Sequence, residues 1–185
     1  MNTVGRRPAA LTGTPGTGKS AVGRLLAGAF GVLEVDELAR RHGAARGAGR
    51  AVEIDLVRLR QALREPTAWG NADLIVGHLA HLLPVREAIV LRCHPVELLA
   101  RLRRGRRGSP ADRHANFVCE ATDVVVGEAL AERRPVYEID TTGRSAGAVA
   151  REVRQRVAAG GPTRVGTVDW LSDPAVTKHL LDRDP

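Results

Sequence analysis

The chain has 185 residues, of which 43% are hydrophobic and 26% charged, and its formal net charge is +7. This length suits one domain with a well-buried core and is too short for two domains of ordinary size. The composition excludes disordered and fibrous proteins, and no apolar run approaches membrane-spanning length. We therefore expect a single cytoplasmic domain with no membrane contact, whose basic surface favours anionic partners such as nucleotides, acidic proteins or RNA.

Apolar runs of strand length alternate with longer segments of helical period, a pattern typical of βαβ units in a parallel sheet. We predict five strands, near Ala9–Thr12, Val32–Val35, Leu74–Gly77, Ala88–Arg92 and Val136–Asp140. We predict five helices, near Lys19–Phe30, Leu56–Arg64, Pro95–Arg104, Pro110–Arg133 and Ala146–Ala159. The fold class is therefore α/β, with a five-stranded parallel sheet flanked by helices.

Three stretches interrupt this alternation. Residues Gly43–Arg50 and Arg103–Gly108 are rich in glycine and arginine, and we interpret both as mobile loops over a ligand. The chain beyond Gly160 is expected to form a C-terminal tail, 161–185, whose Trp170 packs back on the core.

Residues 13–20 read GTPGTGKS, a full match to the P-loop pattern. Its glycines let backbone N–H groups converge on phosphate oxygens at a helix N-terminus. Lys19, one of two lysines in an arginine-rich chain, is expected to reach the β- and γ-phosphates of ATP, and Ser20 to coordinate Mg²⁺. A chance glycine-rich turn would lack the strand before this motif and the helix after it. We predict a nucleotide site formed by Gly13, Thr14, Pro15, Gly16, Thr17, Gly18, Lys19, Ser20 and Ala21.

Ordered motifs continue along nearly the whole chain. They are TGTPGTGKS at Thr12–Ser20, VDELAR at Val35–Arg40, GHLAHLLP at Gly77–Pro84, VLRCHPVELLARLRRG at Val90–Gly105, Asn116 with Glu120, and YEIDTTGRS at Tyr137–Ser145. Together they resemble the adenylate kinase isoenzyme six family and its archaeal members. The resemblance implies a P-loop NTPase of the nucleoside-monophosphate-kinase type, phosphoryl transfer from ATP to AMP, and a part in ribosome maturation.

The resemblance also assigns roles by position. Within a kinase core at 1–160 it implies a monophosphate-binding segment at about 35–60 and a lid at about 103–113. Arg40 then grips the AMP phosphate with its guanidinium group. Arg104 begins the lid that closes over ATP and excludes water. Because the chain is rich in arginine, a solvated helix arginine is the alternative for Arg40.

Histidines and cysteines are the remaining candidates for chemistry. His78 matches the family histidine that could orient an attacking water or an acceptor hydroxyl, and a histidine that caps a strand end is the alternative. His78 and His81 lack a third ligand and make a poor zinc site. Cys93 and Cys119 have no metal or redox spacing, so we predict that both are reduced core residues.

One position departs from the family pattern. The family has an acidic residue two positions before the histidine that matches His78, and its carboxylate normally holds Mg²⁺ through water. This chain has Val76 at that position. Asp73 lies three residues earlier and, at the two-residue period of a strand, should face the opposite side. We therefore expect weaker Mg²⁺ binding and turnover than the family implies, unless the acid is supplied elsewhere.

Four functions fit these observations. The first is an adenylate kinase that uses ATP, Mg²⁺ and AMP. The second is an ATPase in small ribosomal subunit assembly, in which water replaces AMP and the partner is a small-subunit ribosomal protein or rRNA. The third is a kinase of another small acceptor, because P-loop kinases share this core. The fourth, motivated by Val76, is a protein that binds nucleotide without turnover.

Overall fold

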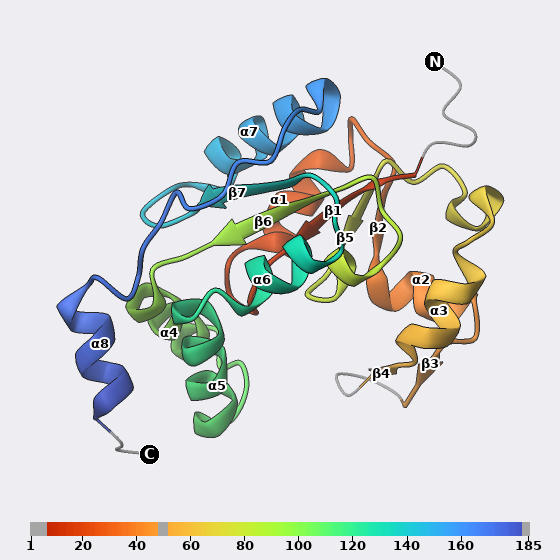
Figure 1. Ribbon diagram of the computed structural model, residues 1–185. Coiled ribbons are helices and arrows are strands. Elements are labelled where there is room, and N and C mark those ends of the chain that lie inside the picture. The colour runs from red at the N-terminus through yellow and green to blue at the C-terminus, as the bar shows by residue number, and fades with distance from the viewer. Residues whose placement is uncertain (1–6, 48–51, 183–185) are drawn as a thin grey trace.

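The computed structural model describes residues 7–47 and 52–182 of the chain, and it is organised around one parallel sheet (Figure 1). Its five strands run in the order β2-β5-β1-β6-β7, and all the pairings between them are parallel. The bounds are β1 Ala9–Thr12, β2 Val32–Glu34, β5 Leu74–Val76, β6 Glu87–Arg92 and β7 Val136–Asp140. The predicted α/β class and five-stranded sheet are confirmed.

Helices cover both faces of the sheet (Figure 1). On one face lie α1, Lys19–Leu26, and α7, Ala146–Ala159. The other face is covered by α2, Val35–Arg41, α3, Leu56–Ala62, and α6, Val124–Ala131, with the short 3₁₀ turns η1, Pro66–Trp69, and η2, Ala80–Leu82. At one end of the molecule are α4, Pro95–Arg104, α5, Pro110–Ala121, and α8, Pro174–Leu181.

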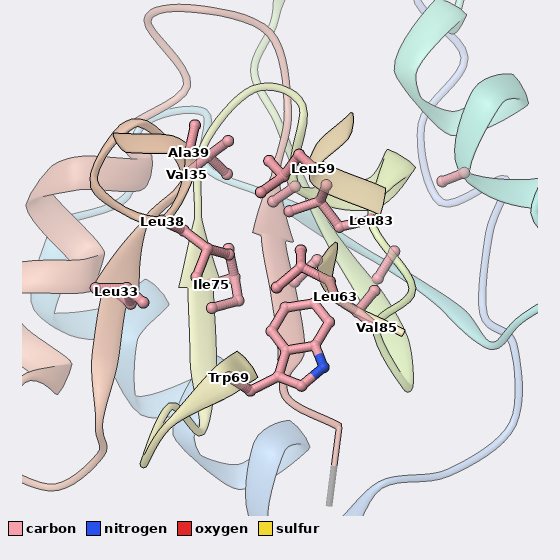
Figure 2. Packing of buried hydrophobic residues seen from close by; sticks show 14 of the residues in the cluster. Leu33, Val35, Leu38, Ala39, Leu59, Leu63, Trp69, Ile75, Leu83 and Val85 are labelled. Carbon is pink, nitrogen blue, oxygen red and sulfur yellow. The ribbon is translucent and has the colours of Figure 1, made fainter. Parts of the chain in front are cut away.

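The sheet strands are apolar on both sides because helices bury both faces. Leu11 and Val76 belong to the core shared with α1 and α7, whereas Ala10 and Ile75 belong to the core under α2, α3 and α6. Figure 2 shows the second core. It contains Leu33, Val35, Leu38, Ala39, Leu59, Leu63, Trp69, Ile75, Leu83 and Val85.

The prediction of a loop at Gly43–Arg50 is wrong for part of residues 43–47, which the structure describes. Ala45–Arg46 forms β3, which pairs antiparallel with β4, Glu53–Ile54, in a separate two-stranded sheet. Residues 48–50 of that prediction lie outside the described residues. Two-residue strands are too short to show a sequence period, so the pattern could not reveal them.

The predicted single helix Pro110–Arg133 is also corrected, because it divides into α5 and α6. Asp123 adopts a left-handed conformation with φ 57, which ends one helix and redirects the chain into the next. Asp residues tolerate this conformation better than most. The Asp123 carboxylate accepts a hydrogen bond from Arg92 on β6, and this long-range contact holds the break in place.

The tail packs on the domain at several points. Arg164 pairs with the edge of β7, where its carbonyl accepts from Glu138 N at 2.9 Å. Beyond that point Trp170 and α8 pack on α4 and α5 around buried Phe117 and Val176.

The two cysteines differ in burial. Cys93 is fully buried, and burial raises the pKa of its thiol to about 12. Both thiols are free, as predicted, and Cys119 is half-buried at the edge of the core under α2, α3 and α6, so its prediction as a core residue is confirmed in part. It lies on α5 beside the P-loop, with its sulfur 3.9 Å from Thr14 Oγ1.

Candidate active site

The P-loop connects the end of β1 to the start of α1, and its glycines are required by the backbone. Gly13, Gly16 and Gly18 have φ values of 135, 100 and 103, a region that side-chain-bearing residues rarely adopt. A Cβ at Gly13 would lie 2.3 Å from the Leu91 carbonyl oxygen. The loop therefore closes tightly against β6, and the first turn of α1 begins directly behind it.

Lys19 lies inside this loop. Its ammonium group donates to the carbonyl oxygens of Gly13 at 2.7 Å and Thr14 at 3.0 Å. Burial lowers the pKa of Lys19 to about 8, although Glu120 and Glu34 partly oppose the effect. The ammonium is thus a desolvated cation at the point where a phosphate would arrive.

A pocket of about 430 Å³ opens beside the loop, and we call it the P-loop pocket. The P-loop, the ends of β2 and β5, and the end of α4 all contribute to it. Its lining is Pro15, Gly16, Gly18, Lys19, Ser20, Ala21, Arg24, Glu34, Asp36, Val76, Gly77, His78, Arg101, Leu102, Gly105 and Arg107.

Predicted site residues are distributed unevenly around this pocket. Lys19, Ser20 and His78 line it together. Arg40 on α2 and Arg104 at the end of α4 are exposed and are not among its lining residues. Arg107, from the loop predicted to lie over a ligand, lines it instead, together with Arg101, which sequence reasoning did not single out.

The carboxylates of the pocket were missed by sequence reasoning. Glu34 ends β2 and Asp36 lies in the first turn of α2, and both line the pocket. The available signal was their position at the carboxyl end of a strand, the edge where parallel α/β sheets bind ligands. Asp73 is elsewhere, at the start of β5, where its Oδ2 accepts from Gly31 N at 2.9 Å.

The two histidines of the GHLAHLLP motif occupy different environments. Burial lowers the pKa of His78, and the nearby Lys19 lowers it further, so its imidazole is neutral near pH 7. His81 is buried between β1 and α6, with Nδ1 2.8 Å from Thr12 Oγ1 and Nε2 3.0 Å from Glu128 Oε2. Among the described residues, no group of three or more His, Cys, Asp or Glu side chains could hold a metal ion.

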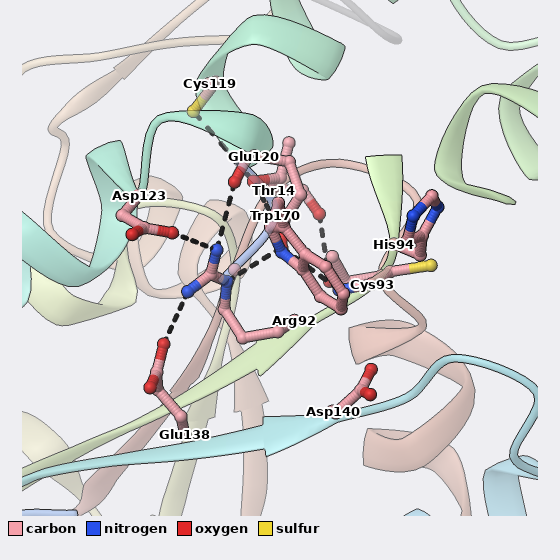
Figure 3. A network of polar contacts seen from close by, with 12 residues as sticks. Thr14, Arg92, Cys93, His94, Cys119, Glu120, Asp123, Glu138, Asp140 and Trp170 are labelled. Atoms are coloured by element: carbon pink, nitrogen blue, oxygen red, sulfur yellow. Dashed lines mark hydrogen bonds and ion pairs between the residues drawn. The ribbon is translucent and has the colours of Figure 1, made fainter. Parts of the chain in front are cut away.

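A buried polar network supports the loop from behind (Figure 3). Thr14 Oγ1 donates to Glu120 Oε2 at 2.6 Å, and Glu120 Oε1 accepts from Arg92 Nε at 2.8 Å. Arg92 also donates to Glu138 at 2.5 Å and to Asp123. Burial works against the charge on Arg92, but Glu120 and Asp123 outweigh it and raise its pKa.

The same network reaches the tail. Trp170 Nε1 lies 3.4 Å from Glu120 Oε1, and the backbone N–H of Thr167 donates to Glu138 Oε2 at 3.1 Å. The P-loop, α5 and the C-terminal segment are therefore linked through two carboxylates.

A second pocket, of about 240 Å³, lies on the other side of Thr17 and Gly18. Arg101 forms one wall and is fixed by donating to the Thr141 carbonyl oxygen at 2.8 Å and to Glu97 Oε1. The full lining of this second pocket is Thr17, Gly18, Val22, Arg101, Thr141, Arg144, Ala146 and Val149.

Oxygen donors suited to Mg²⁺ are present in the P-loop pocket. Mg²⁺ prefers hydroxyl, carboxylate and phosphate oxygens and is usually held by one or two carboxylates together with substrate phosphates. Ser20 supplies a hydroxyl and Glu34 and Asp36 supply carboxylates. The residues of this pocket therefore fit a magnesium–nucleotide complex.

Comparisons with known proteins agree with this geometry. A family model described as an AAA domain matches residues 10–123. A protein of Thermococcus onnurineus named "Putative adenylate kinase" is 37% identical over 92% of this chain and 96% of its own length. A protein of Natronomonas pharaonis with the same name is 41% identical over 92% of this chain and 98% of its own length.

Solved structures share the fold at lower identity. Shikimate kinase from Acinetobacter baumannii, solved with shikimate, has a TM-score of 0.56 at 20% identity and covers 85% of this chain and 96% of its own. The protein TT1252 from Thermus thermophilus has a TM-score of 0.54 at 17% identity, over 84% of this chain and 99% of its own.

Fold and site together define a P-loop phosphotransferase of the kinase class. The chain belongs to the AAA-domain family and to the adenylate-kinase-like family of these archaeal relatives. The resemblance inferred from its motifs is thereby confirmed. Within the described residues, no helix combines the length and apolarity that a membrane crossing requires.

Proposed function

We propose that this protein is an ATP-dependent nucleoside-monophosphate kinase that phosphorylates AMP. The observation that carries the proposal is the P-loop pocket, which is lined by the desolvated Lys19 together with Asp36 and His78. The names of the archaeal relatives support AMP as the acceptor.

Phosphoryl transfer needs positioning and charge rather than a covalent nucleophile. An oxygen of the AMP phosphate attacks the γ-phosphorus of ATP while the bond to the β,γ-bridging oxygen breaks, and two ADP molecules result. Lys19 releases its two carbonyl partners and stabilises the charge on the transferring group. Ser20 would hold Mg²⁺, which would supply positive charge to offset the charge of the nucleotide phosphates.

The acceptor side is built from α2 and the end of β5. His78, neutral near pH 7, orients the acceptor through a hydrogen bond rather than through charge. The Arg40 guanidinium makes no hydrogen bond or ion pair with another residue in the described ranges, so it is available to grip the AMP phosphate.

The second pocket and the lid complete the proposed ATP site. The second pocket adjoins Thr17 and Gly18 and has apolar walls at Val22 and Val149, which suit the flat base of ATP. Arg104 and Arg107 belong to the lid that covers the phosphates with positive charge, and Arg101 adds a further positive charge from the wall of the pocket.

Ligand-dependent melting tests the assignment of substrates. A ligand that binds only the native state raises the melting temperature, and the rise grows with the logarithm of its concentration relative to its dissociation constant. ATP and AMP should each stabilise the protein, whereas CMP and shikimate should not. Stabilisation by ATP and shikimate without any by AMP would replace this proposal with a kinase of another acceptor. Turnover of ATP without AMP binding would favour an ATPase that acts with a small-subunit ribosomal protein or rRNA.

A further inference from the structure

A divalent cation beside a P-loop serine needs a carboxylate from a neighbouring strand. The strand next to β1 on that side is β5, and it ends in the pocket with Val76. Val76 is fully buried, and its Cγ2 lies 3.1 Å from the place where a Cβ on Gly23 would sit. The end of β5 is thus packed tightly on α1 and offers no oxygen.

The next strand, β2, carries a carboxylate at the same level. Glu34 pairs in register with Val76. Val32, two residues before Glu34, packs with Val76 in the core shared with α1, and Leu33 packs on the opposite face. Because side chains alternate along a strand, Glu34 faces the same side as Val76, the side of α1 and Ser20.

Glu34 is also free to take a ligand. Its carboxylate makes no hydrogen bond or ion pair with any other residue of the described ranges, and that carboxylate does not cap α2, of which Glu34 is the N-cap residue. In contrast, Glu37 is paired with Arg41 and Glu120 is engaged by Arg92. An exposed, unpaired carboxylate in the same pocket as Ser20 is the donor that the end of β5 lacks.

We propose that Glu34 at the end of β2 provides the carboxylate that holds nucleotide-bound Mg²⁺, a role that Val76 at the end of β5 cannot fill. The inference rests on the proposed function, because it requires that a nucleotide occupy the P-loop. Asp36 lines the same pocket but lies beyond the strand, in the first turn of α2, and is assigned to the acceptor side.

Binding of Mn²⁺ to the protein with ADP tests this proposal directly. Mn²⁺ prefers the same oxygen ligands as Mg²⁺, and free Mn²⁺ gives an electron paramagnetic resonance signal that bound Mn²⁺ lacks. Glu34→Gln should weaken Mn²⁺ binding to the ADP complex by about tenfold or more. The matched control Asp36→Asn removes the same charge from the same pocket and should weaken it by less than about threefold.

Two further measurements keep the outcomes distinct. ADP binding without metal, followed by calorimetry, should survive in Glu34→Gln, which shows that the P-loop is intact. Glu34→Gln combined with Val76→Asp should regain part of the lost Mn²⁺ affinity, because the carboxylate returns to the neighbouring strand. Equal Mn²⁺ affinity in the native protein and Glu34→Gln would overturn the inference, and failure of the native protein to bind ADP would instead overturn the proposed function.

Discussion

Lys19 is the residue on which the proposed chemistry depends most. Lys19→Met keeps the length and apolar stem of the side chain but removes the charge nearest the transferring phosphoryl group. We expect ATP turnover to fall by at least about a hundredfold, with little change in the melting temperature. The control is Lys178→Met on the exposed face of α8, which replaces the only other lysine. Equal turnover in Lys19→Met and Lys178→Met would contradict the role of Lys19.

The same residue predicts a pH dependence of ATP binding. The pKa of Lys19 is about 8 without nucleotide, because burial disfavours its charge, and bound phosphates must raise it again. The complex therefore holds more protons than the free protein above pH 8, so ATP affinity should fall as the pH rises through this range. Calorimetry in buffers of different ionisation enthalpy should detect proton uptake near pH 8 to 9. If proton uptake on ATP binding persists in Lys19→Met, a group other than Lys19 takes up the proton.

Local sequence was sufficient for the P-loop, because its eight residues determine its conformation by themselves. Glu34 and Glu120 are different. The proposed role of Glu34 follows only from its register with Val76. The role of Glu120 follows only from its contacts with Thr14 and Arg92. These residues are 42, 106 and 28 positions apart from their respective partners, so the contacts arise from tertiary structure. No local pattern could predict them.

At the scale of elements, the buried network couples α5 to the P-loop and β6. Glu120→Gln leaves Arg92 with fewer opposite charges in a buried position and should lower the free energy of unfolding by about 3 kcal/mol. The control Asp123→Asn removes a half-exposed partner of the same arginine and should cost about 1 kcal/mol or less. Urea unfolding of both variants measures the difference. Equal losses of unfolding free energy in the two variants would show that the burial of Glu120 does not determine its contribution to stability.

Most element boundaries could be predicted because burial on both faces makes the sheet strands uniformly apolar. Val136–Asp140 and Ala146–Ala159 match their predicted limits. The division of Pro110–Arg133 could not be predicted, because α5 and α6 share a continuous helical composition and the break depends on the distant Arg92. The pair β3 and β4 was missed because each strand has only two residues.

At the scale of the whole molecule, one ion pair and one histidine–carboxylate hydrogen bond tie the two ends of the site to other parts of the chain. Arg60 on α3 donates to Glu132 Oε1 at 2.6 Å and thereby ties the monophosphate side to the chain after α6. On the other side, His94 Nε2 lies 2.9 Å from Asp173 Oδ2 and connects the start of α4 to α8. The monophosphate side and the α4 side of the P-loop pocket are thus each tied to a distant part of the chain.

Because the two sides are separate, we predict that the binding of AMP and the binding of ATP can be weakened independently. Arg40→Ala should weaken AMP by about tenfold to a hundredfold and leave ATP nearly unchanged, since its proposed contact is confined to the monophosphate. Arg41→Ala is the matched control, because Arg41 is the neighbouring arginine on α2 and is engaged by Glu37. Calorimetry with each nucleotide decides the matter, and equal losses for AMP and ATP in Arg40→Ala would refute the division.

The central claim is that ATP donates its γ-phosphoryl group to AMP in the P-loop pocket. The most direct measurement follows ATP, ADP, AMP and inorganic phosphate by ³¹P nuclear magnetic resonance, with and without AMP, in the native protein and in Lys19→Met. The account predicts two ADP formed for each AMP consumed, at least about tenfold faster than phosphate release from ATP alone, and loss of that reaction in Lys19→Met. Phosphate release at one rate, whether or not AMP is present, would contradict it.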